Sequence, residues 1–150
     1  MLQHDAPAAL LRAAWRRGCR LPDFVPALLQ LVDFSRRHAV RHWLMNIDHL
    51  PPMGPAEQAW IMASWFPAMA TTPVQHLALV LPPDLHNRIV ATTPVFNPPP
   101  AMSFELHFFP DDATGLAWLL DDDPRRHELW QEWEAELARL HREAPDCADA

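Results

Sequence analysis

The chain has 150 residues, with 12 arginines, no lysine, 19 acidic residues and a formal net charge of -7. This length predicts one domain with a substantial core, and the acidic balance argues against binding to nucleic acid. The absence of lysine excludes a P-loop lysine and a Schiff-base lysine, and no apolar run approaches the roughly 20 residues that span a bilayer.

The first half of the chain alternates between predicted strands and helices. Residues 8–16 (AALLRAAWR) could form a strand, although alanine and arginine are poor strand formers. Apolar residues at three- and four-residue spacing predict a helix over 23–38. The short apolar runs at 42–47 (HWLMNI) and 76–81 (HLALVL) are typical of buried parallel strands.

Between these two runs lies a segment, Pro55 to Ala70, that is apolar on nearly every side. A helical wheel places Ile61 and Trp65 on one face and Trp60 and Pro67 on another. A helix that covers a sheet needs only one such face, so we expect the second to meet the C-terminal helix, another subunit or an apolar ligand. Pro67 should end or kink this helix.

The second half continues the alternation. We expect a helix over 84–92 that Pro94 stops, a strand over 104–109 nearer the sheet edge, and a helix from Asp111 and Asp112 through Leu120. The proline-rich stretch 94–102 reads as a connector. After Asp123 and Pro124, a last helix carries a stripe of apolar residues, which are Leu129 or Trp130, Trp133, Leu137 and Leu140.

This order predicts an α/β fold with a mainly parallel four-stranded sheet packed with helices, plus an extra C-terminal amphipathic helix. We assign residues 1–123 to the α/β domain, 124–143 to the C-terminal helix, packed on the domain or on a partner, and 144–150 to a disordered tail. Cys19 and Cys147 read as two free thiols, and we expect a cytoplasmic protein.

The run from HWLMNIDHL through PPMGPAEQAWIMASWFPAM to HLALVLPPDL resembles the bacterial STAS/SEC14-like family, which has the SpoIIAA-like fold. The resemblance covers about residues 10–120 and rests on Asp48, the prolines that follow it, and the sequence Trp65-Phe66-Pro67. Family members often open with a hairpin, for which this chain offers only about seven residues. Classical STAS domains carry a phosphorylatable serine or threonine in the loop after the strand. The loop DHLPPMGP has no hydroxyl side chain, so that phosphoswitch is not expected.

Few residues suggest chemistry. His38 and His42 are four apart but straddle a helix end and a strand start, and no HExxH or cysteine pair is present, so we expect no metal. No glycine-rich phosphate loop or GxSxG serine occurs, and capping explains the acidic clusters. Asp48 and His49 are adjacent and point in different directions at a strand end. We therefore expect neither enzymatic activity nor a cofactor.

We expect a domain that acts through protein association, as a homodimer or with another protein. Its contact residues would be Trp60, Trp65, Phe66, Trp130 and Trp133. The alternative is a carrier or sensor of a small apolar ligand held by the same aromatic residues. If a pocket forms at the carboxyl ends of the strands, Asn46, Asp48 and His49 are its candidate residues.

Overall fold

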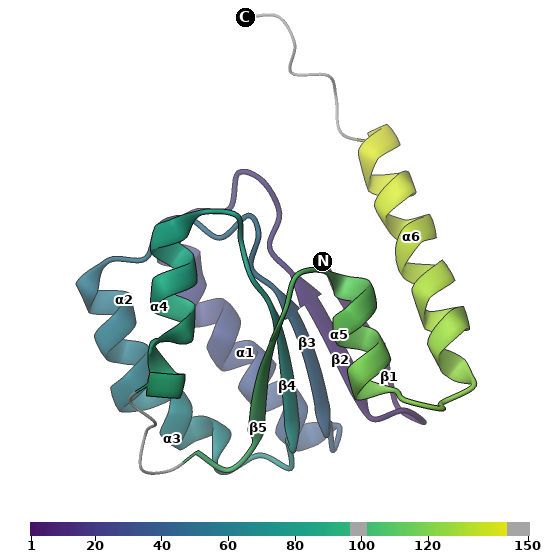
Figure 1. Cartoon of the computed structure of the whole chain (residues 1–150), viewed down its shortest axis with the longest axis horizontal. Coiled ribbons are helices and arrows are strands. Elements are labelled where there is room, and N and C mark those ends of the chain that lie inside the picture. Colours follow the sequence, from purple (N-terminus) through teal and green to yellow (C-terminus); the bar gives the residue numbers. More distant parts are fainter. Residues whose placement is uncertain (97–101, 144–150) are drawn as a thin grey trace, which may run out of the picture.

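The computed structural model of the protein describes residues 1–96 and 102–143 (Figure 1). In these residues five strands form one sheet in the order β1-β2-β3-β4-β5, in which only β1 is antiparallel to its neighbour. The strands are β1 (Leu2–Asp5), β2 (Leu10–Ala14), β3 (His42–Asn46), β4 (His76–Val80) and β5 (Glu105–Phe109). The helices are the 3-10 turn η1 (Leu21–Asp23), α1 (Phe24–Arg37), α2 (Pro55–Trp60), the π-helical turn η2 (Ile61–Trp65), α3 (Phe66–Met69), α4 (Leu85–Phe96), α5 (Asp112–Leu119) and α6 (Arg125–Glu143).

The α/β class, the mostly parallel sheet and the long C-terminal helix are confirmed, but the predicted count of four strands is wrong. The first residues form β1, which pairs antiparallel with β2 from Leu2 opposite Ala13 to Asp5 opposite Leu10. The chain reverses between them at residues 6–9, where Ala9 has a φ of 49°. The sequence LQHD is too short and polar to signal a strand alone, so only its pairing with β2 reveals it.

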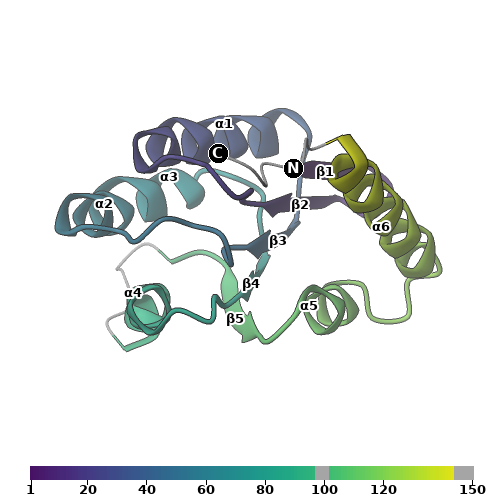
Figure 2. The same cartoon turned by 90° about the horizontal axis from the view of Figure 1, so that it is seen from above.

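Helices cover both faces of the sheet (Figure 2). The α1 face is the side covered by α1, the α2–α3 helix and α4, and strand residues such as Trp43, Met45 and Leu77 point into its core. The α5 face is the side covered by α5 and α6, where Leu44 and Ala78 point. Adjacent residues of one strand thus enter different cores, as the strand repeat requires. Both faces of the parallel strands are buried, which explains their continuous apolar runs.

The apolar segment at Pro55–Ala70 is one nearly continuous helix with a π-helical turn in its middle. In that turn the Phe66 N–H donates to the carbonyl of Ile61, five residues back. The helix does not end at Pro67 but two residues later, at Met69, because the wider turn before the proline accommodates its missing N–H. On its second apolar face Trp60 packs edge-on against Phe24 of α1, with ring centroids 6.2 Å apart, whereas Ala63 and Pro67 remain exposed.

Two other boundaries differ from expectation or lie outside the described residues. Helix α4 runs to Phe96 and passes Pro94, since a proline in the last turn removes one hydrogen bond without preventing two further residues. The predicted connector 94–102 includes residues 97–101, and the predicted tail 144–150 lies wholly outside the described residues. Within residues 1–96 and 102–143, no helix is both long enough and apolar enough to cross a membrane.

Candidate functional site

The five aromatic residues that we expected to form one contact surface lie on opposite faces of the sheet. Trp65 and Phe66 are 6% and 1% exposed within the α1 face, and Trp60 is half-buried beside them. Trp133, 2% exposed, and the half-buried Trp130 belong to α6 on the α5 face. The two tryptophan-bearing helices therefore do not cover one another.

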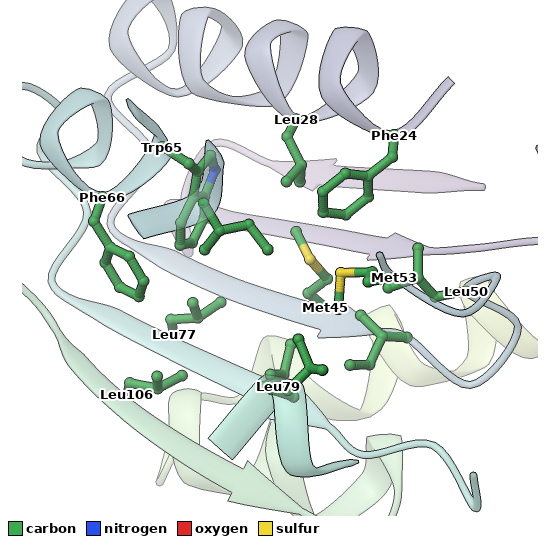
Figure 3. Close-up of a pocket in the computed structure, with 14 residues that line it drawn as sticks. Phe24, Leu28, Met45, Leu50, Met53, Trp65, Phe66, Leu77, Leu79 and Leu106 are labelled. Atoms are coloured by element: carbon green, nitrogen blue, oxygen red, sulfur yellow. The ribbon is translucent and has the colours of Figure 1, made fainter. Parts of the chain in front are cut away.

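A cavity of about 80 Å³ lies in the core of the α1 face, beside Trp65 and Phe66 (Figure 3). No titratable side chain is among the described residues that line it. The lining residues are Phe24, Leu28, Met45, Ile47, Leu50, Met53, Ile61, Trp65, Phe66, Leu77, Leu79, Val90, Ala91 and Leu106. Such a site holds a ligand by burial of apolar surface and offers almost no polar recognition.

The cavity walls come from segments far apart in the chain. Strands β3 and β4 form its floor, and α1 contributes Phe24 and Leu28 from one side. The π-turn η2 contributes Ile61 and Trp65 from another, and the Trp65 ring contacts the Phe66 ring with centroids 5.0 Å apart. The lining side chains that are only half-buried come from η2, α4 and β5, among them Ile61 and Val90. The cavity therefore opens toward the space between these three elements.

Trp65 differs from the neighbouring Trp43 in its hydrogen bonding. The Trp43 Nε1–H donates to Ser35 Oγ at 2.8 Å, and that hydroxyl donates in turn to the Leu31 carbonyl at 2.8 Å. The Trp65 Nε1 atom is equally buried but has no acceptor among the described residues. Buried indole N–H groups normally find a partner, so Trp65 is an exception among the described residues. Its Nε1 atom is itself fully buried and is therefore not exposed to the cavity.

The loop between β3 and α2 closes one end of the cavity and is held by α4. Its Leu50 and Met53 side chains line the cavity. Asn87, 2% exposed, donates from Nδ2 to the Leu50 carbonyl at 2.9 Å, and its Oδ1 accepts from the Met53 N–H at 3.2 Å. Gln58 donates to the Met53 carbonyl at 3.1 Å. A loop with two consecutive prolines is thus fixed through side chains rather than through a strand ladder.

The predicted strand-end residues lie at a second site, a groove of about 790 Å³ over the carboxyl ends of β3, β4 and β5. Asn46 and Asp48 line this groove together with Trp130 and Trp133 of α6, whereas His49 is not among the lining residues. His49 lies 3.9 Å from Asp48, at the limit of an ion pair. The strand order runs without reversal, so the sheet has no switch point of the kind that places ligands in many α/β proteins.

Beneath this groove lies a buried ion pair that the sequence did not reveal. Arg12 of β2 is 1% exposed and donates from Nη2 to Asp112 Oδ2 at 2.5 Å, while Asn46 donates to the other carboxylate oxygen at 2.6 Å. The guanidinium carbon lies 4.0 Å from the centroid of the Trp133 ring and 5.2 Å from that of Trp130. Burial lowers the pKa of Arg12, while the hydrogen bond and charge of Asp112 oppose that shift.

Two histidines, His42 and His76, form a stacked pair at one end of the sheet. His42 and His76 stack at the start of β3 and β4 with ring centroids 5.1 Å apart, and their Nδ1 atoms lie 3.2 Å apart. In residues 1–96 and 102–143 no group of three or more histidine, cysteine, aspartate or glutamate side chains could hold a metal ion. Helix capping by Asp111, which accepts from the Thr114 N–H at 2.8 Å, agrees with the role expected for that acidic cluster.

Trp65 and Phe66, two of the expected contact residues, line the cavity, but the sequence did not indicate most of the residues around them. Arg12 is a lone charge inside an apolar strand run, which signals a buried partner but does not name it. Asn87 follows a Pro-Pro-Asp helix start, a position where an asparagine is ordinarily solvated. In comparisons with known proteins, no family model, curated protein or solved structure matches this chain.

Proposed function

We propose that this protein binds a small, largely apolar molecule in the cavity of the α1 face, as a carrier or sensor and not as an enzyme. The observation that supports this proposal is an apolar space of about 80 Å³ in the core of the α1 face. Protein interiors are close-packed, and an unfilled cavity lowers stability in proportion to its volume. A molecule that fills the space therefore gains apolar contacts without displacing any protein side chain.

Association through the aromatic cluster, the other function expected from the sequence, has less support. Trp65, Phe66 and Trp133 are already buried within a single chain and have little surface left to offer a partner. The exposed large apolar side chains of the described residues are Leu2, Leu29 and Ile89, which belong to three different elements. Single apolar side chains scattered over a surface are ordinary and mark no interface.

We also propose that the chain is a divergent relative of the STAS/SEC14-like family. Two observations support it: the β1–β2 hairpin that opens the chain, as in many members of that family, and the unbroken parallel run from β2 to β5. The loop of residues 48–54 carries no hydroxyl, so this proposal includes no phosphorylation switch. The ligand cavity does not depend on this kinship, because it follows from the packing of the α1 face.

The binding proposal can be tested with isobutene, an apolar probe of four heavy atoms, and protein labelled with ¹³C at the methionine methyl groups. Met45 and Met53 line the cavity, whereas Met69 is buried in the same core but does not line it. Saturable binding should shift the methyl resonances of Met45 and Met53 and leave that of Met69 nearly unchanged. If no methyl resonance responds to isobutene, the cavity does not bind small apolar molecules and the proposal fails.

A matched pair of variants tests whether isobutene binds in the cavity or elsewhere on the protein. Ala91→Leu adds three carbon atoms at a lining position of α4, and Ala63→Leu adds the same atoms at an exposed position of η2. The first variant should abolish the isobutene response and the second should retain it. Equal responses in the two variants would mean that the probe binds elsewhere.

A further inference from the structure

We propose that the protein has a second binding site between helix α1 and the β1–β2 hairpin, and that this site takes an organic anion with one carboxylate and an apolar body. We call this space the hairpin groove, and its volume is about 650 Å³. Sites for small molecules commonly have volumes of about 300–1,000 Å³. The inference goes beyond the proposed function, because among the described lining residues the hairpin groove shares only Met45 with the cavity of the α1 face.

Apolar side chains form most of the hairpin groove. Leu11 and Ala13 of β2 belong to the core of the α1 face and line the groove from the sheet. Leu31 and Phe34, which lie on one side of α1, line it from the helix, and Trp15 lines it just after β2. Trp15 and Phe34 are only half-buried. An apolar ligand body can therefore remove its own surface and theirs from water here, which favours binding.

The side chains of the groove that carry a full charge are positive, although the chain has a formal net charge of -7. Two arginines, Arg16 and Arg37, line the groove, and no acidic residue is among its described lining residues. Arg37 forms an ion pair with Asp33 at 2.7 Å. Arg16 is exposed, so its guanidinium can reach a ligand in the groove. The planar fork of a guanidinium matches the two oxygens of a carboxylate.

The two arginines lie at opposite ends of the groove, and the Arg16 end favours the anion. Phe24, the first residue of α1, stacks on Trp15 with ring centroids 5.8 Å apart, so α1 begins near Arg16. Arg37 is the last residue of α1, which has 14 residues and is therefore about 20 Å long. The macrodipole of α1 adds positive potential at its beginning and negative potential at its end. The carboxylate of the ligand accordingly binds Arg16, and the apolar body lies along α1 toward Phe34.

The experiment is an NMR titration of the full chain with hydrocinnamate, a carboxylate joined to a phenyl ring by two methylene groups. The reporters are the indole N–H of Trp15 and the ¹³C-labelled methyl groups of Met45 and Met53. Trp15 lines the hairpin groove, Met53 lines the cavity, and Met45 lines both. Saturable binding should shift the resonances of Trp15 and Met45 and leave that of Met53 nearly unchanged. If Trp15 does not respond, or if Met53 shifts as much as Met45, the hairpin groove is not the binding site and the proposal is overturned.

A matched probe and a matched pair of variants isolate the charge. Hydrocinnamamide has as many heavy atoms as hydrocinnamate but is neutral. Arg16→Gln removes a guanidinium that lines the groove, whereas Arg17→Gln removes the exposed guanidinium of the next residue, which is not a lining residue. At an ionic strength of about 0.15 M, Arg16→Gln should weaken hydrocinnamate binding about three- to five-fold, the effect of an exposed ion pair, and leave the Kd of hydrocinnamamide unchanged. Arg17→Gln should change neither Kd.

The outcomes separate this proposal from the proposed function. Equal losses of hydrocinnamate affinity in the two variants, or equal losses for the two probes in Arg16→Gln, would overturn the assignment of Arg16 as the partner of the carboxylate. Both arginines are exposed, so both variants should fold, and unchanged methyl resonances in the absence of a probe check this. The response of Met53 to isobutene reports on the cavity alone, so the cavity can be tested whether or not hydrocinnamate binds.

Discussion

The two faces of the sheet are buried by different kinds of side chain. The α1 face is filled with aromatic and aliphatic side chains, yet it retains a cavity and an unpaired indole N–H. The α5 face buries a charged side chain, Arg12, but pairs it with Asp112 and stacks it on Trp133. Helix α5 also lies close to the sheet there, because Gly115 faces Leu44 where a Cβ atom would stand only 2.8 Å from Leu44 Cδ1.

Both faces nevertheless contain buried donors without an acceptor among the described residues. On the α5 face Asp112 accepts from Arg12 and Asn46, but the Nε and Nη1 atoms of Arg12 are buried without an acceptor among the described residues. On the α1 face the donor of Trp65 points to nothing described in the protein. The groove above Arg12 is larger than the cavity, but size alone does not make it the better binding site. The cavity is the stronger candidate because apolar side chains line it, so an apolar molecule can fill it without displacing bound polar groups.

The largest predicted effect is a loss of stability on removal of the Arg12–Asp112 ion pair of the α5 face. Asp112→Ala should lower the free energy of unfolding by about 3 kcal/mol, because it leaves the buried Arg12 guanidinium without its counter-ion. Urea denaturation with a fixed m-value measures this change. The cavity should keep its isobutene response in the variant, since none of its lining residues contacts Asp112 through a hydrogen bond or ion pair among the described contacts.

A second substitution serves as its control. Arg12→Met combined with Asp112→Ala removes both charges and keeps an apolar side chain of similar length under the Trp133 ring. This double variant should be more stable than Asp112→Ala alone, because the cost lies in the unpaired charge and not in the lost attraction. If the double variant is the less stable of the two, the Arg12 side chain stabilises the fold even without Asp112, and the explanation by an unpaired charge is wrong.

The next effect sharpens the contrast between the two buried tryptophans. Ser35→Ala removes the acceptor of Trp43 and so gives that residue the unpaired state of Trp65. The free energy of unfolding should fall by about 2 kcal/mol, the penalty for a buried donor left unsatisfied. Ser35→Cys, which keeps a weak acceptor in nearly the same volume, should lose less. An unchanged midpoint in Ser35→Ala would show that an unpaired buried indole N–H carries no penalty in this core.

Sequence patterns predicted the helices and the parallel strands because each depends on local periodicity. The runs at 42–47 and 76–81 and the stripe ending in Leu140 show their apolar pattern without help from other segments. Strand β1 could not be predicted in this way, since its four residues become a strand only by pairing with β2. The π-turn before Pro67 likewise has no local signature that distinguishes it from a kink.

The site was less predictable than the fold, and for a related reason. Trp65 and Phe66 stood out as large apolar residues, but their placement in one core and that of Trp133 in another depends on which face each helix covers. Sequence periodicity gives the buried side of a helix and not its neighbour. The partners of Arg12 and Asn87 lie 100 and 37 positions away along the chain, respectively, so only the folded chain brings them together.

The smallest predicted effect concerns pH and arises from the stacked pair at the start of β3 and β4. Burial, followed by the nearby His76 and Arg41, lowers the pKa of His42 below its usual value of 6.5. The unfolded chain therefore binds this proton more tightly, so the stability linked to His42 is fully present above about pH 6.5 and is lost as the pH falls through the lowered pKa.

The variant His42→Gln has no titrating group at this position and should show a shallower loss of stability than the natural chain over this pH range. His4, whose pKa burial also lowers, is unchanged in both proteins and contributes equally to both slopes. Identical slopes in urea denaturation series at several pH values would show that the His42–His76 pair does not couple folding to protonation.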